Sequence, residues 1–129
     1  MPRTQNKNSK DITLTFDVLG YYEDDEWCAL ALDMDLRGHG TTFENAIDDL
    51  QESIAMQVGF AQFKNDPDLI FRPAEPLYYK LFAEVRGELL RAQAWSENIE
   101  ISDYQVADIP LPPPHVIAEH KKAFAPEGA

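Results

Sequence analysis

The residues of this sequence that could do chemistry are carboxylates spaced closely along the chain. The candidate metal ligands are Asp33, Asp35, Glu44 and Asp48. Carboxylates on a strand and a neighbouring helix can hold the two Mg²⁺ ions that cleave a phosphodiester bond. The spacing argues against it, because Asp33 and Asp35 share one face of an extended segment while Glu44 is predicted to cap a helix. The surroundings supply no cluster of basic residues to hold a phosphate. We therefore expect neither a metal site nor a nuclease.

The histidines, the single cysteine and the serines do not form a catalytic set. His39 lies between two glycines, where a turn residue with a solvated ring is the ordinary explanation. His115 and His120 are five residues apart, which is not the i, i+4 spacing of a helical zinc pair. Cys28 lies in an apolar stretch and is predicted to be part of the core, and Ser53 has no histidine in register. We expect a protein that is not an enzyme and has no cofactor.

The charge of the chain is strongly negative and unevenly distributed. The formal net charge is −12 at pH 7. Residues 11–63 contain twelve acidic residues and one base, Arg37. Such a surface repels the phosphates of nucleic acid and attracts a basic partner by long-range steering. A solvated face that only promotes solubility is the alternative. We expect no direct binding of nucleic acid.

The first third of the chain predicts an antiparallel meander of three strands. Apolar and polar residues alternate from Ile12 to Val18, the period of two expected of a half-buried strand. Gly20 is predicted to mark a bend or bulge before the acidic hairpin tip at 23–26. The return strand is apolar on both faces, which predicts a central position in the sheet. The strands are predicted at 12–18, 27–32 and 36–39.

A long amphipathic helix is predicted from about residue 42 to 63. Thr41 and Glu44 have the spacing of a capping box, in which each side chain accepts a hydrogen bond from the backbone N–H of the other. Apolar residues at steps of three and four form one stripe from Phe43 to Ala61. Further apolar residues widen this face beyond what one small sheet would cover. They are Met56, Phe60 and Phe63. This surplus predicts either a second helix packed there or a subunit interface.

The rest of the chain predicts a second helix and a fourth strand. Pro76 suits the first turn of a helix over about 73–94, and a strand follows at 99–106. The order strand, strand, strand, helix, helix, strand indicates an α+β domain with its helices on one face of the sheet.

The domain organisation follows from these elements. Residues 1–11 are predicted to be a disordered leader, 12–109 a single α+β domain with a helical insertion at about 73–94, and 110–129 a proline-rich extended tail with at most one helical turn. No apolar run is long enough to span a membrane. The first residues have charges but no apolar region behind them, so they do not read as a secretory signal. We expect a cytoplasmic protein.

Three short motifs follow one another in the first half of the chain. They are Glu23-Asp24-Asp25-Glu26 with Trp27, then Asp35-Leu36-Arg37-Gly38, then Gly40-Thr41-x-x-Glu44-x-Ala46. With the strands around them, over roughly residues 12–58, they resemble the HicB family, the antitoxin half of bacterial HicA–HicB toxin–antitoxin pairs. The resemblance implies a partial ribonuclease-H-like sheet with one main helix. It also implies a toxin of double-stranded-RNA-binding fold that degrades mRNA. The chain departs from the family in the helix at 73–94, and we expect no appended DNA-binding domain.

Two functions from different classes are compatible with these patterns. The first is a HicB-like antitoxin or stand-alone relative that covers a small basic RNA-cleaving toxin with its acidic face. Its predicted contacts are Glu23, Asp24, Asp25, Glu26, Asp33 and Asp35. The second is a self-assembling structural module without a toxin, a dimer or tetramer with Met56, Phe60 and Phe63 in its interface. A third interpretation is a small-ligand binder with a pocket between the second helix and the sheet.

Overall fold

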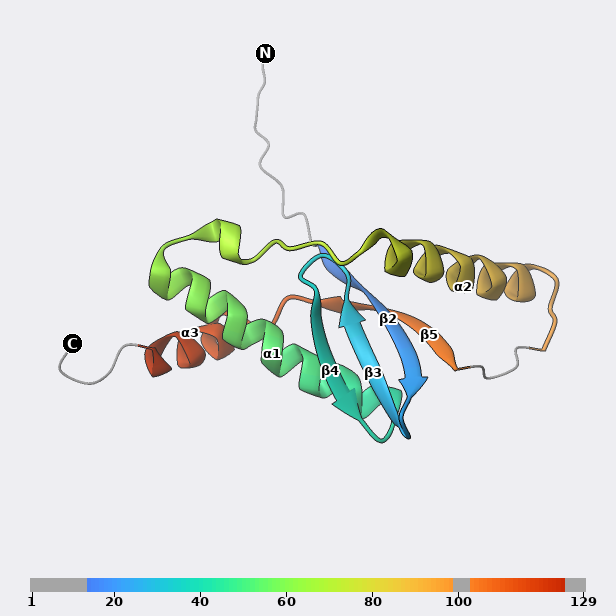
Figure 1. Cartoon of the computed structure of the whole chain (residues 1–129), viewed down its shortest axis with the longest axis horizontal. Coiled ribbons are helices and arrows are strands. Elements are labelled where there is room, and N and C mark those ends of the chain that lie inside the picture. Colours follow the sequence, from blue (N-terminus) through green and yellow to red (C-terminus); the bar gives the residue numbers. More distant parts are fainter. Residues whose placement is uncertain (1–13, 99–102, 125–129) are drawn as a thin grey trace, which may run out of the picture.

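The chain forms one antiparallel sheet with helices packed against both of its faces (Figure 1). The computed structural model describes residues 14–98 and 103–124. The strands are β2 (Thr15–Glu23), β3 (Glu26–Ala31), β4 (Leu36–Gly40) and β5 (Tyr104–Pro110), in the order β4-β3-β2-β5. The predicted α+β class and the meander of the first three strands are confirmed. The predicted leader and Ile12 lie outside the described residues.

β2 runs without a break through Gly20, where the sequence predicts a bend or bulge. Its register with β3 and with β5 continues on both sides of this residue. A Cβ atom built on Gly20 would lie 2.3 Å from Cε1 of Phe43. The prediction was wrong, because the glycine makes room for the ring that packs on the strand rather than for a change in chain direction.

The last strand ends later than the sequence predicts. Residues 99–102 of the predicted strand lie outside the described part of the chain, and β5 continues past 106 to Pro110. It pairs with β2 residue by residue, ending with Pro110 opposite Thr15. Ile109 is buried in the core. The sheet therefore includes Pro110, the first residue of the segment that the sequence predicts to be an extended tail.

The helix α1 (Phe43–Lys64) begins one residue later than the predicted capping box requires. Its N-cap is Thr42, whose Oγ1 accepts a hydrogen bond from the backbone N–H of Asn45 at 3.0 Å. Thr41 accepts instead from the side-chain amide of Asn45 at 3.2 Å. The predicted Thr41–Glu44 box is therefore wrong. Glu44 is an exposed residue of the first turn, where its charge complements the positive end of the helix dipole.

Helices cover both faces of the sheet, whereas the sequence predicts helices on one face only. On one face α1 packs against Val18. On the other, α2 (Pro76–Ala94) packs against Leu19 and Leu30, with Phe82 among the buried residues. Successive residues of a strand point to opposite faces. Central strands that are apolar at consecutive positions therefore need a cover on each side.

The segment between α1 and α2 carries the chain from one face to the other. It contains the short helix η1 (Pro67–Leu69) and then runs along the end of β3. There the backbone N–H of Arg72 donates to the carbonyl of Asp33, and that of Ala74 to the carbonyl of Leu32, both at 2.8 Å. These two hydrogen bonds fix where the second layer begins.

The C-terminal segment forms the helix α3 (Pro114–Ala123), where the sequence predicts an extended tail. α3 lies beside the second half of α1 (Figure 1). Gly59 allows the close approach, because a Cβ atom there would lie 2.9 Å from the backbone nitrogen of Lys121. Ile117 is buried in the layer that α1 forms. The tail prediction was wrong, and this helix belongs to the packed domain.

Alanine substitution of Gly38 would test how closely α1 packs against β4, with Gly87 as the control position. A Cβ atom on Gly38 would lie 2.3 Å from the carbonyl oxygen of Ala46, whereas one on Gly87 of α2 has no atom within 4 Å. We expect Gly38→Ala to lower the free energy of unfolding by about 2–3 kcal/mol, because backbone must move to accept the methyl group. Gly87→Ala should raise it by about 0.5–1 kcal/mol, because alanine favours a helix. Urea denaturation measures both, and equal effects would contradict the close packing.

Candidate partner-binding surface

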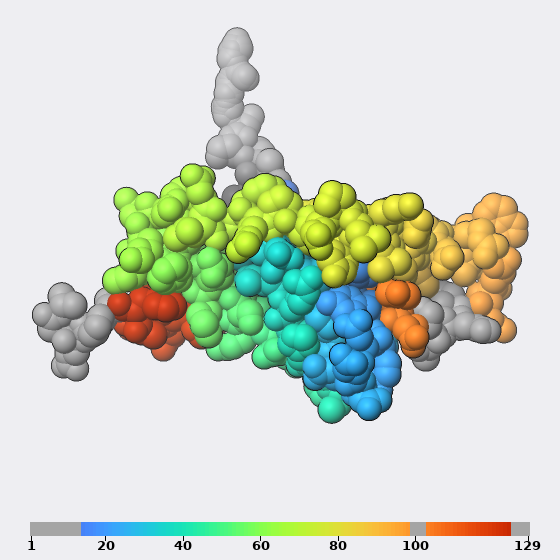
Figure 2. Space-filling view, in the orientation of Figure 1, coloured from blue at the N-terminus to red at the C-terminus, as the bar shows by residue number. Residues whose placement is uncertain are grey.

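The β2–β3 hairpin ends in four carboxylates, which we call the acidic tip. It consists of Glu23, Asp24, Asp25 and Glu26. Glu23 and Glu26 are cross-strand neighbours, and the two aspartates between them have φ angles of 55° and 63°. Positive φ at both central residues is the mark of a type I′ turn, whose twist matches that of the strands. All four residues are exposed, and the hairpin projects at the lower edge of Figure 2.

Aromatic rings brace the hairpin below this tip. Tyr22 and Trp27 are cross-strand neighbours with ring centroids 5.6 Å apart. Trp27 also packs against Phe43, the first residue of α1, at 5.8 Å. Phe43 is buried and Trp27 is half-buried. The tip is therefore carried on a hairpin that is packed against the core.

His39 links the acidic tip to α1. Its Nδ1 lies 3.3 Å from Oε1 of Glu26, and its backbone N–H donates to the carboxylate of Asp49 at 2.9 Å. His39 belongs to β4 and not to a turn, although its side chain is exposed as the sequence predicts. The acidic surface thus continues from the tip onto the first half of α1.

Asp33 and Asp35 lie at the opposite end of the sheet from the acidic tip. They belong to the turn that follows β3, whereas the tip includes the first residue of this six-residue strand, and an extended strand of that length spans about 20 Å. The hydroxyl of Tyr79 donates to Oδ1 of Asp33 at 2.8 Å, and Oδ1 of Asp35 accepts from Arg37 at 3.1 Å. The structure therefore does not bring the six predicted contacts into one patch. The residues of the tip do form one.

Arg37 is held in place by aromatic side chains beside Asp35. Its Nε donates to the hydroxyl of Tyr21 at 3.1 Å, and its guanidinium carbon lies 5.3 Å from the centroid of the Tyr78 ring. Burial acts to lower the pKa of Arg37, but the hydrogen bond with Tyr21 and the charge of Asp35 raise it above the usual value. Burial also raises the pKa of Tyr21 to about 12. This base stays charged and stays bound to its neighbours.

Asp17 and Asp108 form a carboxyl pair that the sequence analysis did not single out. They face each other across β2 and β5, on the face that α2 covers. Burial, then a hydrogen bond with Asp108 and repulsion from Asp108 and Asp33, raise the pKa of Asp17, while Arg86 acts to lower it. No local pattern reveals this pair, because only the register of two strands far apart in the sequence brings it together.

The described residues hold no group of three or more His, Cys, Asp or Glu side chains that could bind a metal ion. The carboxylates considered as ligands, Asp33, Asp35, Glu44 and Asp48, are among these described residues. None of the helices in this part of the chain is long and apolar enough to cross a membrane.

The residues predicted for an oligomer interface lie on the outer side of α1. Met56 and Phe63 are 47% and 40% exposed. Phe60 is half-buried, with its ring centroid 5.1 Å from that of Phe124 just after α3. Part of the wide apolar face of α1 is thus covered by another helix, and the sequence analysis predicts either such a helix or a subunit interface there. The helix is α3 and not the one at 73–94. A subunit interface on Met56, Phe60 and Phe63 stays a prediction.

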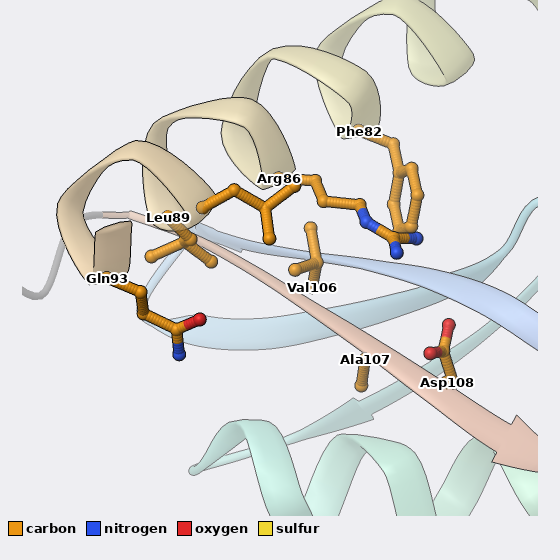
Figure 3. A pocket seen from close by; sticks show the side chains of 8 residues that line it. Phe82, Arg86, Leu89, Gln93, Val106, Ala107 and Asp108 are labelled. Atoms are coloured by element: carbon orange, nitrogen blue, oxygen red, sulfur yellow. The ribbon is translucent and has the colours of Figure 1, made fainter. Parts of the chain in front are cut away.

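A shallow hollow lies between α2 and the outer side of β5, and we call it the α2–β5 hollow (Figure 3). It is lined by Phe82, Arg86, Leu89, Leu90, Gln93, Val106, Ala107 and Asp108. Its volume is about 220 Å³, which is below the usual range for small-molecule sites, roughly 300–1,000 Å³. The hollow is therefore small for the ligand pocket that the sequence predicts between the second helix and the sheet.

Comparison with known protein families, curated proteins and solved structures finds no match for this chain. The relation to HicB proteins stays a prediction based on the three short motifs. The acidic tip is the candidate surface because its geometry and charge are both defined by the structure.

Removing one charge from the carboxyl pair should stabilise the protein. We expect Asp17→Asn to raise the free energy of unfolding at pH 7 by on the order of 0.5 kcal/mol, since like charges directly opposite each other weaken a sheet. Because the pKa of Asp17 is raised in the folded chain, the folded chain loses stability as the pH rises from the unfolded pKa toward the folded one. The gain should therefore vanish well below the unfolded pKa of about 3.9, where the carboxyl is protonated in both states.

Thermal melts across pH measure this effect, with Glu84→Gln on the exposed side of α2 as the matched loss of one charge. A gain that is the same at pH 3 and pH 7, or that equals the gain of the control, would contradict the role of the pair.

Proposed function

We propose that this chain is a non-enzymatic interaction protein, a HicB-like antitoxin or a stand-alone relative, that binds a small basic RNA-cleaving protein through its acidic tip. The observation that carries the proposal is the tip itself. It presents four exposed carboxylates on a hairpin that Trp27 and Phe43 brace against the core. A surface with fixed geometry and one sign of charge is suited to the recognition of an oppositely charged partner.

The charge required of the partner follows from its chemistry. A protein that cuts RNA must hold phosphates, and it does so with lysine and arginine side chains. The carboxylates of the acidic tip would offer the phosphate-binding side chains of such a partner a negatively charged surface in place of RNA. The resulting attraction acts over about 10 Å at moderate salt, so it speeds the encounter as well as holding the complex.

Within this proposal, Asp33 and Asp35 are less suited to contact the partner than the other four predicted residues. Asp33 and Asp35 accept hydrogen bonds from Tyr79 and Arg37 and lie at the far end of β3. The acidic tip, with Asp49 beside it through His39, is the continuous acidic surface. Arg37 does not neutralise that surface, because it is held beside Asp35.

The first test is capture of a partner. The tagged full-length protein is incubated with an extract of its native host at low salt, and the bound material is identified by mass spectrometry. We expect a short basic protein in a stoichiometric amount that is released as the salt concentration rises. Recovery of the bait alone would contradict the proposal.

Neutralising the tip tests the contact surface once the partner is known. The double variant Asp24→Asn/Asp25→Asn removes two charges, and asparagine tolerates the positive φ angles of this turn. We expect association several-fold slower and less dependent on salt. The matched control is Glu84→Gln/Glu88→Gln, which removes two charges from the exposed side of α2. Stopped-flow or surface-plasmon measurements compare them, and an equal slowing in both would overturn the assignment of the tip.

A further inference from the structure

β5 is an edge of the sheet with a regular backbone. It pairs with β2 over seven consecutive residues, without a bulge. No strand among residues 14–98 and 103–124 pairs with its other side. The opposite edge, β4, is shorter and lies under α1 so closely that Gly38 has no room for a Cβ atom. A long open edge is a template for a further strand unless it is covered or charged.

The hydrogen-bonding pattern shows which backbone groups of β5 point outward. The N–H of Tyr22 donates to the carbonyl of Asp103 at 2.9 Å, so this cross-strand pair is a hydrogen-bonded one. Hydrogen-bonded and non-hydrogen-bonded pairs alternate along an antiparallel ladder. Gln105, Ala107 and Ile109 therefore direct their backbone groups to β2. Val106 and Asp108 direct theirs outward.

A hollow flanks this edge on each face of the sheet. The α2–β5 hollow lies on the α2 face, with Val106, Ala107 and Asp108 of the strand in its lining. The second, which we call the proline hollow, has a volume of about 330 Å³ and lies on the α1 face. It is lined by Asp48, Gln51, Glu52, Pro110, Leu111, Pro112, Pro113 and Val116. A strand added beside β5 would place alternate side chains toward the two hollows.

The distribution of charge favours a second copy of the chain as the added strand. The described residues from Lys64 to Phe124 contain nine acids and seven bases, so the part of the molecule that contains α2, β5 and α3 is nearly neutral. The acidic residues 11–63 would repel a second copy. Two acidic chains can therefore approach each other at the β5 edge with less repulsion than at the acidic tip, although Asp48 and Glu52 lie beside this edge.

We propose that two copies pair their β5 strands antiparallel across a two-fold axis and form a continuous eight-stranded sheet. In the register centred on Ala107, Val106 of each copy lies opposite Asp108 of the other, so the outward backbone groups of both residues are paired. Ala107 meets its own counterpart in a non-hydrogen-bonded pair, where a small side chain suits the short Cα separation of about 4.5 Å. Pro110, which has no N–H, stays at the ends of the ladder.

Side chains support the same arrangement. Asp108 of one copy would enter the α2–β5 hollow of the other, where Arg86 is the basic residue of the lining. Gln105 of one copy would point toward the proline hollow of the other, where Asp48 and Glu52 can accept from its amide. Leu90, which is 55% exposed in the first hollow, would be covered. This self-association does not depend on the basic partner proposed above.

Proline at an outward position tests the pairing without breaking the ladder to β2. Proline is tolerated in an edge strand where its missing N–H faces solvent. We expect the full-length protein to be a dimer in sedimentation equilibrium. The Asp108→Pro variant should be folded by circular dichroism but sediment as a monomer. The Asp108→Asn variant should remain a dimer. A wild-type monomer at every concentration would overturn the proposal. So would a folded Asp108→Pro variant that dimerises as the wild type does, or loss of the dimer on Met56→Lys/Phe63→Lys.

A cysteine variant tests the register and does not depend on the proline variant folding. Two Ala107→Cys chains would have Cα atoms within the range of a disulfide, so mild oxidation should give a covalent dimer on a non-reducing gel. The matched control, Gln105→Cys, lies opposite Ile109 in this register and should not cross-link. Cys28 is buried, and the wild-type protein, which has this cysteine alone, gives the background level of cross-linking. Equal cross-linking of both variants, or of neither, would exclude the register centred on Ala107.

Discussion

Val18 and Leu19 are neighbours in β2, and both are fully buried, each in a different hydrophobic layer. The same holds for Ala29 and Leu30 in β3. A central strand pair of this kind exposes apolar surface on both faces until both are covered. α1 and α3 meet that need on one side and α2 on the other. The crossing segment, bonded to the end of β3, is the physical link between the two layers.

This two-sided core also sets where the charges can lie. Of the residues buried in the described part of the chain, none is polar or charged. Carboxylates are therefore driven to the hairpin tip, the strand ends and the outer side of α1, where water solvates them. Asp17 shows the cost of a less exposed position, since burial and the facing Asp108 both raise its pKa. The acidic tip avoids that cost because it projects beyond the sheet.

The two proposed surfaces use different physical forces at separate places. The acidic tip would act through long-range charge, whereas the β5 edge would act through backbone hydrogen bonds and the two hollows beside it. Edge pairing is specific because the outward groups alternate and a slip of one residue would reverse the two faces. Because the two surfaces are separate and use different forces, an acidic protein can associate with itself at one and attract a basic partner at the other.

Local sequence patterns determined much of this protein. The alternation in β2, the double-sided apolar run of β3 and the helical period of α1 and α2 each follow from a few neighbouring residues, and so does the charge of residues 23–26. Tertiary structure alone decided the rest. The place of α2 on the second face, the docking of α3 at Gly59, the Asp17–Asp108 pair and the separation of Asp33 from the acidic tip depend on contacts between residues far apart in the chain. Periodicity and turn chemistry describe one segment at a time, so they carry no information about which segments meet.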